Sequence, residues 1–184
     1  DLKDIHGVCL DIDDTLSTEG KLTSEAFASL WNLKQAGFKV IPITGRPAGW
    51  CDHIARFWPV DAVVGENGAF TMAMQGQKLK RVETLASSSS RGPADLLEDL
   101  KAKVLKKFPQ AKWASDQAYR NYDLAIDICE DVQAWGRASV DQLLDLCHKE
   151  GAHAKLSSIH VNAWFGEYDK RTGFQALLKN ELGK

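Results

Sequence analysis

The chain of 184 residues is 44% hydrophobic and 26% charged, and its formal net charge is −2. This length suits one domain of ordinary size, or one domain that carries a small insert. No apolar run is long enough to cross a membrane, and no basic excess indicates a nucleic-acid-binding surface, so both of those classes are excluded.

The first third of the chain alternates predicted strands and helices. Strands are expected at 6–10, 38–44 and 61–64, and helices at 25–36 and 47–58. Pro42 is awkward within the second strand because it cannot donate to a ladder. The second helix is expected to bury Trp50, Ile54 and Phe57 along one stripe. Short connections between these elements predict parallel strands with right-handed crossovers.

The pattern changes after the third strand. Runs at 69–74 and 79–83 predict a hairpin, and the serines at 87–90 predict either a linker or a plain surface loop. Further along, we expect a helix at 95–108, a strand at 122–128, a helix around 140–147, a strand at 160–165 and a helix at 172–182. The strand at 122–128 alternates apolar and polar residues, so it is expected to be half-buried.

These elements together predict an α/β protein. Its core would be a Rossmann-like parallel sheet, and an α+β segment with an open-faced sheet would be inserted into it. The expected parts are the first part of the core at 1–83, the insert at 84–164, and the return to the core at 165–184.

The four cysteines are far apart and include no CxxC pair, which argues against a zinc site or a disulfide framework. Cys9 and Cys147 stand at apolar positions and are predicted to be buried free thiols. No secretory signal is visible, so the expected compartment is the cytoplasm. Nothing in the sequence indicates an oligomeric state.

Three carboxylates, Asp11, Asp13 and Asp14, directly follow the first strand, and Thr15 follows them. Turn formation or helix capping would explain one such aspartate. Several carboxylates at one strand end repel one another, and a divalent cation with oxygen ligands would relieve that repulsion. A carboxylate beside such a cation can attack phosphorus. The pattern therefore favours phosphoryl transfer.

Polar residues also follow the second and third strands. Thr44 and Gly45 come just before a helix N-terminus, which is a natural phosphate seat at the carboxyl edge of a sheet, although Thr44 could simply be a helix cap. Glu66 and Asn67 follow the third strand, where turn formation is a sufficient explanation for Asn67. Lys170 precedes the last helix, and a solvated lysine is its alternative interpretation.

Together these motifs resemble those of the haloacid dehalogenase superfamily of aspartate-dependent phosphohydrolases. The Asp-x-Asp-x-Thr motif is matched by Asp11, Asp13 and Thr15, the second motif by Thr44, and the lysine motif by Lys170. The position of the insert resembles that of the α/β cap in the Cof-type, subclass IIB branch. That branch includes sucrose-phosphate, mannosylphosphoglycerate and phosphoglycolate phosphatases.

The resemblance implies a Mg²⁺-dependent phosphomonoester hydrolase that acts on a small sugar phosphate or a phosphoglycolate-like acid through an aspartyl-phosphate. Asp11 would be the nucleophile, Asp13 would carry protons, and Lys170 would offset negative charge. Asp11 and the backbone carbonyl of Asp13 would hold Mg²⁺. The residues expected to bind phosphate are Asp11, Ile12, Asp13, Thr44, Gly45 and Lys170.

The resemblance also implies that the insert closes over the site and contacts the leaving group. His160, Asn162 and Trp164 share one strand face and could contact a sugar, although an ordinary exposed strand face explains them equally well. Arg46 could hold a second anionic group or only cover a surface. The remaining candidates for substrate contact are Glu66 and Asn67.

One family motif has no match in the chain. The acidic Gly-Asp-x-x-x-Asp stretch that would complete the Mg²⁺ site is expected after Lys184. We therefore expect the chain to be truncated before the last core strands. Two other functions remain open: a phosphotransferase or phosphomutase, and a non-catalytic metabolite-binding module on the same fold, which a natural stop at Lys184 would favour.

Overall fold

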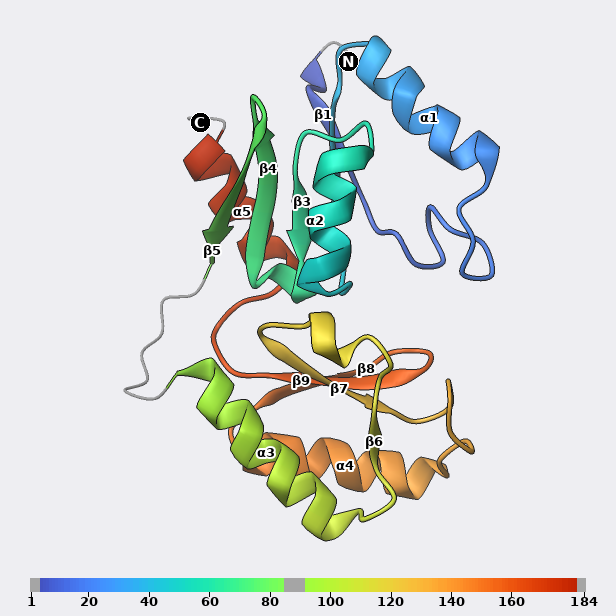
Figure 1. The fold of residues 1–184 in the computed structure, drawn as a ribbon, viewed down its shortest axis with the longest axis vertical. Coiled ribbons are helices and arrows are strands. Elements are labelled where there is room, and N and C mark those ends of the chain that lie inside the picture. The colour runs from blue at the N-terminus through green and yellow to red at the C-terminus, as the bar shows by residue number, and fades with distance from the viewer. Residues whose placement is uncertain (1–3, 85–91, 182–184) are drawn as a thin grey trace. The chain divides into compact units, whose positions relative to one another are not determined.

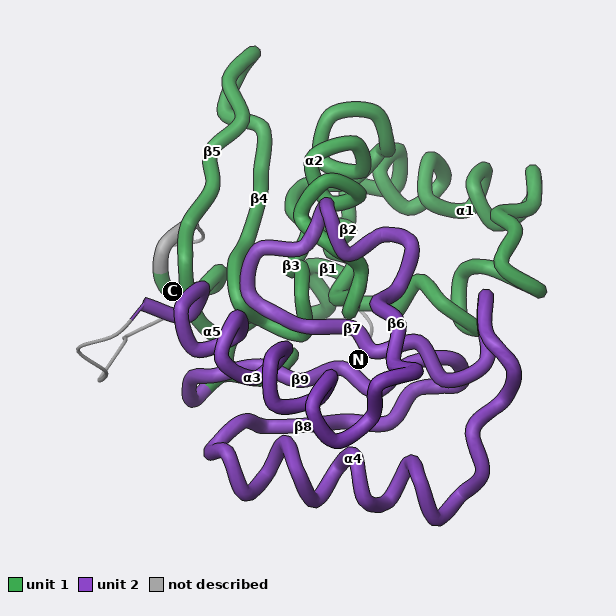
Figure 2. The backbone as a smooth tube through the Cα atoms, turned by 60° about the horizontal axis from the view of Figure 1, so that its bottom comes forward, with its two compact units in different colours: residues 1–85, 168–184 green, residues 86–167 purple. Residues whose placement is uncertain are grey.

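The computed structural model describes residues 4–84 and 92–181. The chain divides into two compact units, one of residues 1–85 and 168–184 and the other of residues 86–167 (Figure 2). The predicted linker at 87–90 lies outside the described residues. Helices and strands occur in both units, which confirms the predicted α/β class. None of the described helices combines the length and apolarity needed to cross a membrane.

The first unit contains parallel and antiparallel strands (Figure 1). β1 (Gly7–Leu10) and β2 (Lys39–Pro42) are parallel, and a single parallel bridge between Ile43 and Val64 leads on to β3. β3 (Val63–Gly65), β4 (Phe70–Gln75) and β5 (Lys78–Glu83) form an antiparallel meander. Pro42 is the last residue of β2, a position where a missing backbone donor is tolerated.

The α-helices described in this unit are α1 (Ser24–Gln35), α2 (Ala48–Phe57) and α5 (Lys170–Glu181). Alternate residues of β3 face different helices, as the two-residue period of a strand requires. Val64 packs with Leu177 of α5, whereas a Cβ added at Gly65 would meet the Cys51 side chain of α2. This sheet and its helices carry the residues of the candidate site.

The second unit has a four-stranded antiparallel sheet in the order β6-β7-β9-β8. The strands are β6 (Lys112–Trp113), β7 (Asp123–Asp127), β9 (His160–Trp164) and β8 (His153–Leu156). α3 (Pro93–Lys107) and α4 (Arg137–Lys149) pack with it around a core that includes Val104, Leu124, Ile126, Leu143 and Val161. β6 and β8 escaped sequence analysis because β6 has two residues and β8 is mostly exposed.

Two predictions about burial are wrong. Trp50 is 44% exposed and Phe57 is 72% exposed, because α2 packs through a different stripe, made of Ala48, Cys51, Ile54 and Ala55. Small side chains in that stripe let the helix lie close to the sheet, and the large rings remain outside. β7 is buried along its whole length, including Asp123 and Asp127, rather than half-buried.

The cysteines offer a test of this burial. Cys9 and Cys129 are exposed, whereas Cys51 and Cys147 are buried, so the prediction of a buried Cys9 is wrong and that of Cys147 is right. Burial raises the pKa of Cys147 to about 11, and partial burial of the Cys9 thiol raises the pKa of Cys9 although the residue as a whole is exposed. We expect Ellman's reagent to modify Cys129 fastest in the folded protein and Cys147 only after unfolding in urea. Rapid labelling of Cys147 without denaturant would contradict this.

Candidate active site

The first ion pair of the candidate site joins residues 159 positions apart in the sequence. Asp11 follows the carboxyl end of β1, and Lys170 begins α5. The Lys170 Nζ donates to Asp11 Oδ2, and the other oxygen, Oδ1, accepts the backbone N–H of Ile12 at 2.8 Å. Both side chains remain about 40% exposed, at 39% for Asp11 and 40% for Lys170. Asp11 is therefore held in place and still accessible.

A second ion pair lies beside the second carboxylate of the same loop. Arg46 Nε lies 3.1 Å from each carboxylate oxygen of Asp13, and Arg46 Nη2 lies 2.5 Å from Oδ1. The guanidinium also lies 4.5 Å from the centre of the Trp50 ring, a cation–π contact. Arg46 was expected to hold a second anionic group or to cover a surface, and in this structure it holds Asp13. Trp50, on the exposed side of α2, therefore packs against the Arg46 guanidinium.

Thr44 is fully buried at the end of β2. Its Oγ1 accepts the backbone N–H of Arg46 at 3.0 Å, and its own N–H donates to Val64 O at 2.9 Å. The hydroxyl therefore closes the loop that carries Arg46. It does not cap α2, whose N-cap residue is Pro47.

Glu66 differs most from what the sequence suggests. This candidate for substrate contact is fully buried, and its Oε1 accepts the N–H of Ala48, the first residue of α2, at 2.9 Å. A carboxylate is favoured at a helix N-terminus, where N–H groups and the helix dipole point toward it. One N–H at the helix N-terminus where a phosphate seat was expected is therefore taken by a side chain of the protein. The Glu66 side chain is buried, not exposed as a substrate contact would require.

The turn around Glu66 has an unusual backbone. Glu66, Asn67 and Gly68 have φ angles of 41°, 56° and 111°, all in the left-handed region that only glycine adopts without cost. A Cβ added at Gly45 would lie 3.2 Å from Oδ1 of Asn67, so the Asn67 side chain lies against the Thr44–Arg46 loop. Asp14 also has a positive φ of 56°, which fits a turn residue.

The three candidates in the second unit have partners inside that unit. His160 is buried, and its Nε2 lies 2.8 Å from Glu130 Oε2. Asn162 Nδ2 donates to Asp123 Oδ2 at 3.2 Å, and the buried Trp164 stacks on His153 with 5.7 Å between ring centres. Only Asn162, at intermediate burial, presents its side chain partly to solvent. These partners are sufficient to explain His160 and Asn162 as structural residues.

Sequence reasoning missed the polar residue that organises this sheet face. Arg120 has a side chain only 4% exposed, and its guanidinium bridges Asp116 at 2.9 Å and Asp123 at 3.1 Å. Burial raises the pKa of Asp123, although Arg120 and Asn162 act in the opposite direction. The signal available in the sequence was the two aspartates on either side of Arg120.

Residues 8–122, more than half of the chain, match the family model of haloacid dehalogenase-like hydrolases. The chain belongs to this family. The family resemblance inferred from the sequence motifs is thereby confirmed. Asp11 and Asp13, the carboxylates after β1, belong to the first of those motifs.

Several solved structures share this fold. A Thermoplasma acidophilum protein is 17% identical, with 95% of this chain and 71% of that one covered and a TM-score of 0.72. The sucrose-phosphatase of Synechocystis sp. is 15% identical, with 95% and 70% covered and a TM-score of 0.63. A subclass IIB sugar phosphatase is 12% identical, with 96% and 75% covered and a TM-score of 0.61. No curated protein sequence matches the chain.

The described residues of this haloacid dehalogenase-like chain do not form a complete cation site. Within 4–84 and 92–181, no three side chains of the Asp, Glu, His or Cys type lie close enough together to hold a metal ion. Asp11 and Asp13 lie on one loop, but each is already held by a cationic side chain. Two carboxylates on that loop are donors suited to a hard cation, and further ligands would be needed.

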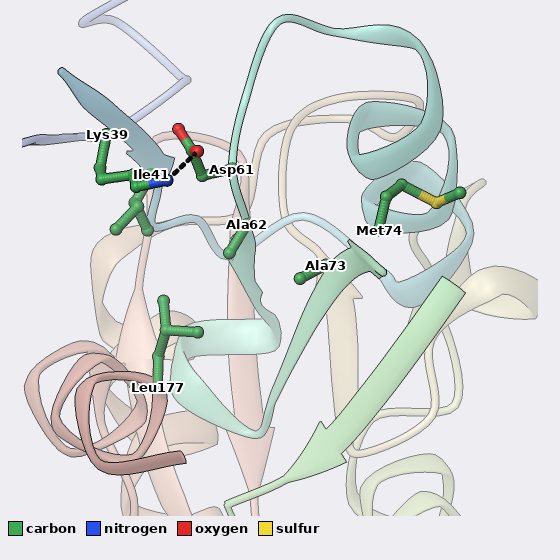
Figure 3. Close-up of a pocket in the computed structure, with 7 residues that line it drawn as sticks. All are labelled: Lys39, Ile41, Asp61, Ala62, Ala73, Met74 and Leu177. Carbon is green, nitrogen blue, oxygen red and sulfur yellow. Dashed lines mark hydrogen bonds and ion pairs between the residues drawn. The ribbon is translucent and has the colours of Figure 1, made fainter. Parts of the chain in front are cut away.

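A cavity of about 200 Å³ lies elsewhere in the same unit (Figure 3). Its lining residues are Lys39, Ile41, Asp61, Ala62, Ala73, Met74 and Leu177. Lys39 begins β2, whereas Thr44 follows its end, so the cavity lies at the opposite edge of the sheet from the candidate site. Burial opposes ionisation of Asp61, but hydrogen bonds from Lys34, the Val40 N–H and Lys39 lower its pKa below the usual value. We assign this cavity no part in the chemistry.

Proposed function

We propose that this haloacid dehalogenase-like hydrolase is a phosphatase that removes phosphate from a small phosphomonoester, with Asp11 as the nucleophile. The observation that carries the proposal is the Asp11–Lys170 pair at the carboxyl end of β1. An accessible carboxylate held beside an ammonium group can attack phosphorus, while the ammonium group offsets the charge of the phosphoryl oxygens.

The proposed reaction has two steps. In the first, Asp11 attacks phosphorus, the bond from phosphorus to the alcohol oxygen breaks, and Asp13 gives that oxygen a proton. In the second, Asp13 takes a proton from a water molecule that attacks the aspartyl-phosphate, and inorganic phosphate leaves Asp11. Arg46 holds Asp13 beside Asp11 on the same loop, and Thr44 fixes the loop that carries Arg46.

The proposed substrate is a sugar phosphate or, as the alternative, a phosphoglycolate-like acid. The support is that one structural neighbour is a sucrose-phosphatase and another is a subclass IIB sugar phosphatase. We further propose that the second unit is a cap that contacts the leaving group, and that the protein works in the cytoplasm.

Mg²⁺ is the proposed cofactor, and when bound it would offset charge between the nucleophile and the phosphate. Asp11 and the backbone carbonyl of Asp13 would contribute two ligands. Further oxygen ligands would be needed to complete the site.

Lys170 and Mg²⁺ would compete for Asp11, and this competition can be measured. We expect Lys170→Ala to tighten Mg²⁺ binding by up to about fivefold, because an ion pair this exposed contributes at most about 1 kcal/mol. Isothermal titration calorimetry of the wild type and the variant would give the change. Lys179→Ala, which removes an exposed lysine from the same helix, is the matched control and should leave Mg²⁺ affinity unchanged. Weaker Mg²⁺ binding by Lys170→Ala would contradict the proposal that Asp11 is a Mg²⁺ ligand.

The proposal as a whole is tested by incubating the protein with a panel of phosphorylated sugars and carboxylic acids, with Mg²⁺ and with EDTA. Release of inorganic phosphate that stops with EDTA is the expected result. Product analysis separates hydrolysis from transfer, because a phosphotransferase would yield a second phosphorylated sugar in place of free phosphate. Binding of sugar phosphates without any turnover would favour the metabolite-binding alternative.

A further inference from the structure

Lys170 must meet a residue that lies 159 positions earlier, so something must fix the start of α5 relative to the β1 loop. Hydrogen bonds at the helix start are local. Asp169 Oδ1 accepts the Thr172 N–H at 2.7 Å, and Thr172 Oγ1 accepts the Asp169 N–H at 2.7 Å. These bonds cap the helix, but they do not hold it against the rest of the unit.

A glycine pair brings the start of the helix into close contact with the rest of the unit. Gly173 is buried one turn into α5, and a Cβ placed there would lie 2.7 Å from the Gly68 Cα and 2.8 Å from the Gly68 O. A Cβ on Gly68 would lie 2.0 Å from Asp169 O and 3.1 Å from Lys170 N. The nearest obstacles are backbone atoms, which cannot move aside as a flexible side chain can; a Cβ at Gly173 would also lie 2.9 Å from Val64 Cγ1. Only two glycines allow α5 to approach the turn this closely.

The same turn is also fastened to the loop that carries Arg46. Glu66 N donates to Arg46 O at 3.1 Å, and Asn67 N donates to Thr44 O at 3.1 Å. The buried Glu66 carboxylate adds its bond to Ala48 N. η2 (Glu66–Gly68) therefore contacts both α5 and the Arg46 loop, and these two elements carry the cations that pair with Asp11 and Asp13.

We propose that the Gly68–Gly173 contact positions Lys170 against Asp11. The expected effect on kcat rests on the proposed function, whereas the expected effect on the Lys170–Asp11 pair rests on geometry alone. Alanine favours a helix over glycine by about 1 kcal/mol, so at an open position Gly173→Ala would strengthen α5. Here the added methyl group must push the helix start away from the turn, and Lys170 moves with it.

The structural test compares crystal structures of the wild type, Gly173→Ala and Gly136→Ala. Gly136 precedes α4, and a Cβ added there meets nothing, so it is the matched control. We expect the Lys170–Asp11 pair to be broken in Gly173→Ala and intact in Gly136→Ala. An intact pair in Gly173→Ala would overturn the proposal.

The kinetic test is a double-mutant cycle with Lys170→Ala, run with thermal unfolding of each variant to verify folding. Gly173→Ala alone should lower kcat by about 10²-fold, the order expected for a displacement near 1 Å, and should lower it no further when Lys170 is already alanine. A further loss in the Lys170→Ala background would indicate general damage and overturn the proposal. A wild type without turnover would refute the proposed function, and the structural comparison would still decide the positioning role.

Asp169→Ala covers the case in which Gly173→Ala fails to fold. It removes the cap of α5 but adds nothing at the glycine contact, at a cost in stability of about 1 kcal/mol. If the glycine contact positions Lys170, this variant keeps the Lys170–Asp11 pair and its kcat. Loss of the pair would show that the cap is the positioning device, contrary to the proposal.

Discussion

Asp11→Asn is expected to lower phosphate release from any phosphomonoester by at least about 10³-fold, since removal of a catalytic nucleophile has effects of that size or larger. The amide cannot form the aspartyl-phosphate, although it keeps the size of the carboxylate and can still accept the Ile12 N–H. Initial rates measured at saturating substrate, with the Mg²⁺ concentration fixed, would give the effect on kcat.

Unfolding would not explain such a loss. Asp11 and Lys170 are both about 40% exposed, so their pairing contributes at most about 1 kcal/mol to stability. The thermal midpoint of the variant should therefore stay close to that of the wild type.

Asp14→Asn is the matched control because it makes the same chemical change three residues away. Asp14 has a positive φ of 56°, a conformation that Asn also adopts readily. It should keep nearly full activity. Equal losses at Asp11 and Asp14 would refute the assignment of the nucleophile, and so would substantial turnover by Asp11→Asn.

Arg120→Ala is expected to destabilise the second unit by about 3–5 kcal/mol, because it leaves the buried Asp123 carboxylate without its cationic partner. Asp123 is 1% exposed, so water cannot replace the guanidinium. Urea unfolding followed by circular dichroism would measure the change in the free energy of unfolding. Arg137→Ala, which removes an ion pair whose arginine side chain is 79% exposed, should cost about 0.5 kcal/mol or less.

Lowering the pH should reduce the loss of unfolding free energy that Arg120→Ala causes. Burial raises the pKa of Asp123, and without Arg120 less remains to oppose that effect. A carboxyl whose folded pKa exceeds its unfolded value is compatible with folding while protonated and opposes folding as the pH rises through that window. The difference between the variant and the wild type should therefore be smaller near pH 4.5 than at pH 7. A deficit that grows with acid would refute this explanation, and Asp123→Asn in the Arg120→Ala background should recover part of the stability at pH 7.

Local patterns in the sequence were sufficient for the fold class and for naming the residues that gather at the end of β1. Asp11, Asp13 and Thr44 follow strands that apolar runs identify, and Lys170 is the first residue of a helix with a clear apolar period. Parallel strands place their carboxyl ends at one edge, so the neighbourhood of these residues could be expected from order alone.

The wrong or missing details depend on which side chain is nearest in space. Trp50 and Phe57 have the period of a buried stripe, but small residues on another face of α2 pack closer to the sheet. Glu66 was predicted as a candidate for substrate contact, and only the path of the chain shows that its carboxylate accepts an N–H at a helix N-terminus. Asp123 and Asp127 appeared to be the solvent side of a strand. Their partners lie just outside the alternating run: Arg120 before it pairs with Asp123, and backbone N–H groups after it donate to Asp127.

The two units differ in whether their residues are continuous in the sequence. The second unit is one continuous stretch, residues 86–167, whereas the first needs residues from both sides of that stretch. During synthesis the second unit can therefore fold as soon as it emerges, but Asp11 must wait until Lys170 has been translated before it gains its partner. Closing such a long loop also slows folding. We expect the Asp11 site to be among the last parts of the molecule to form.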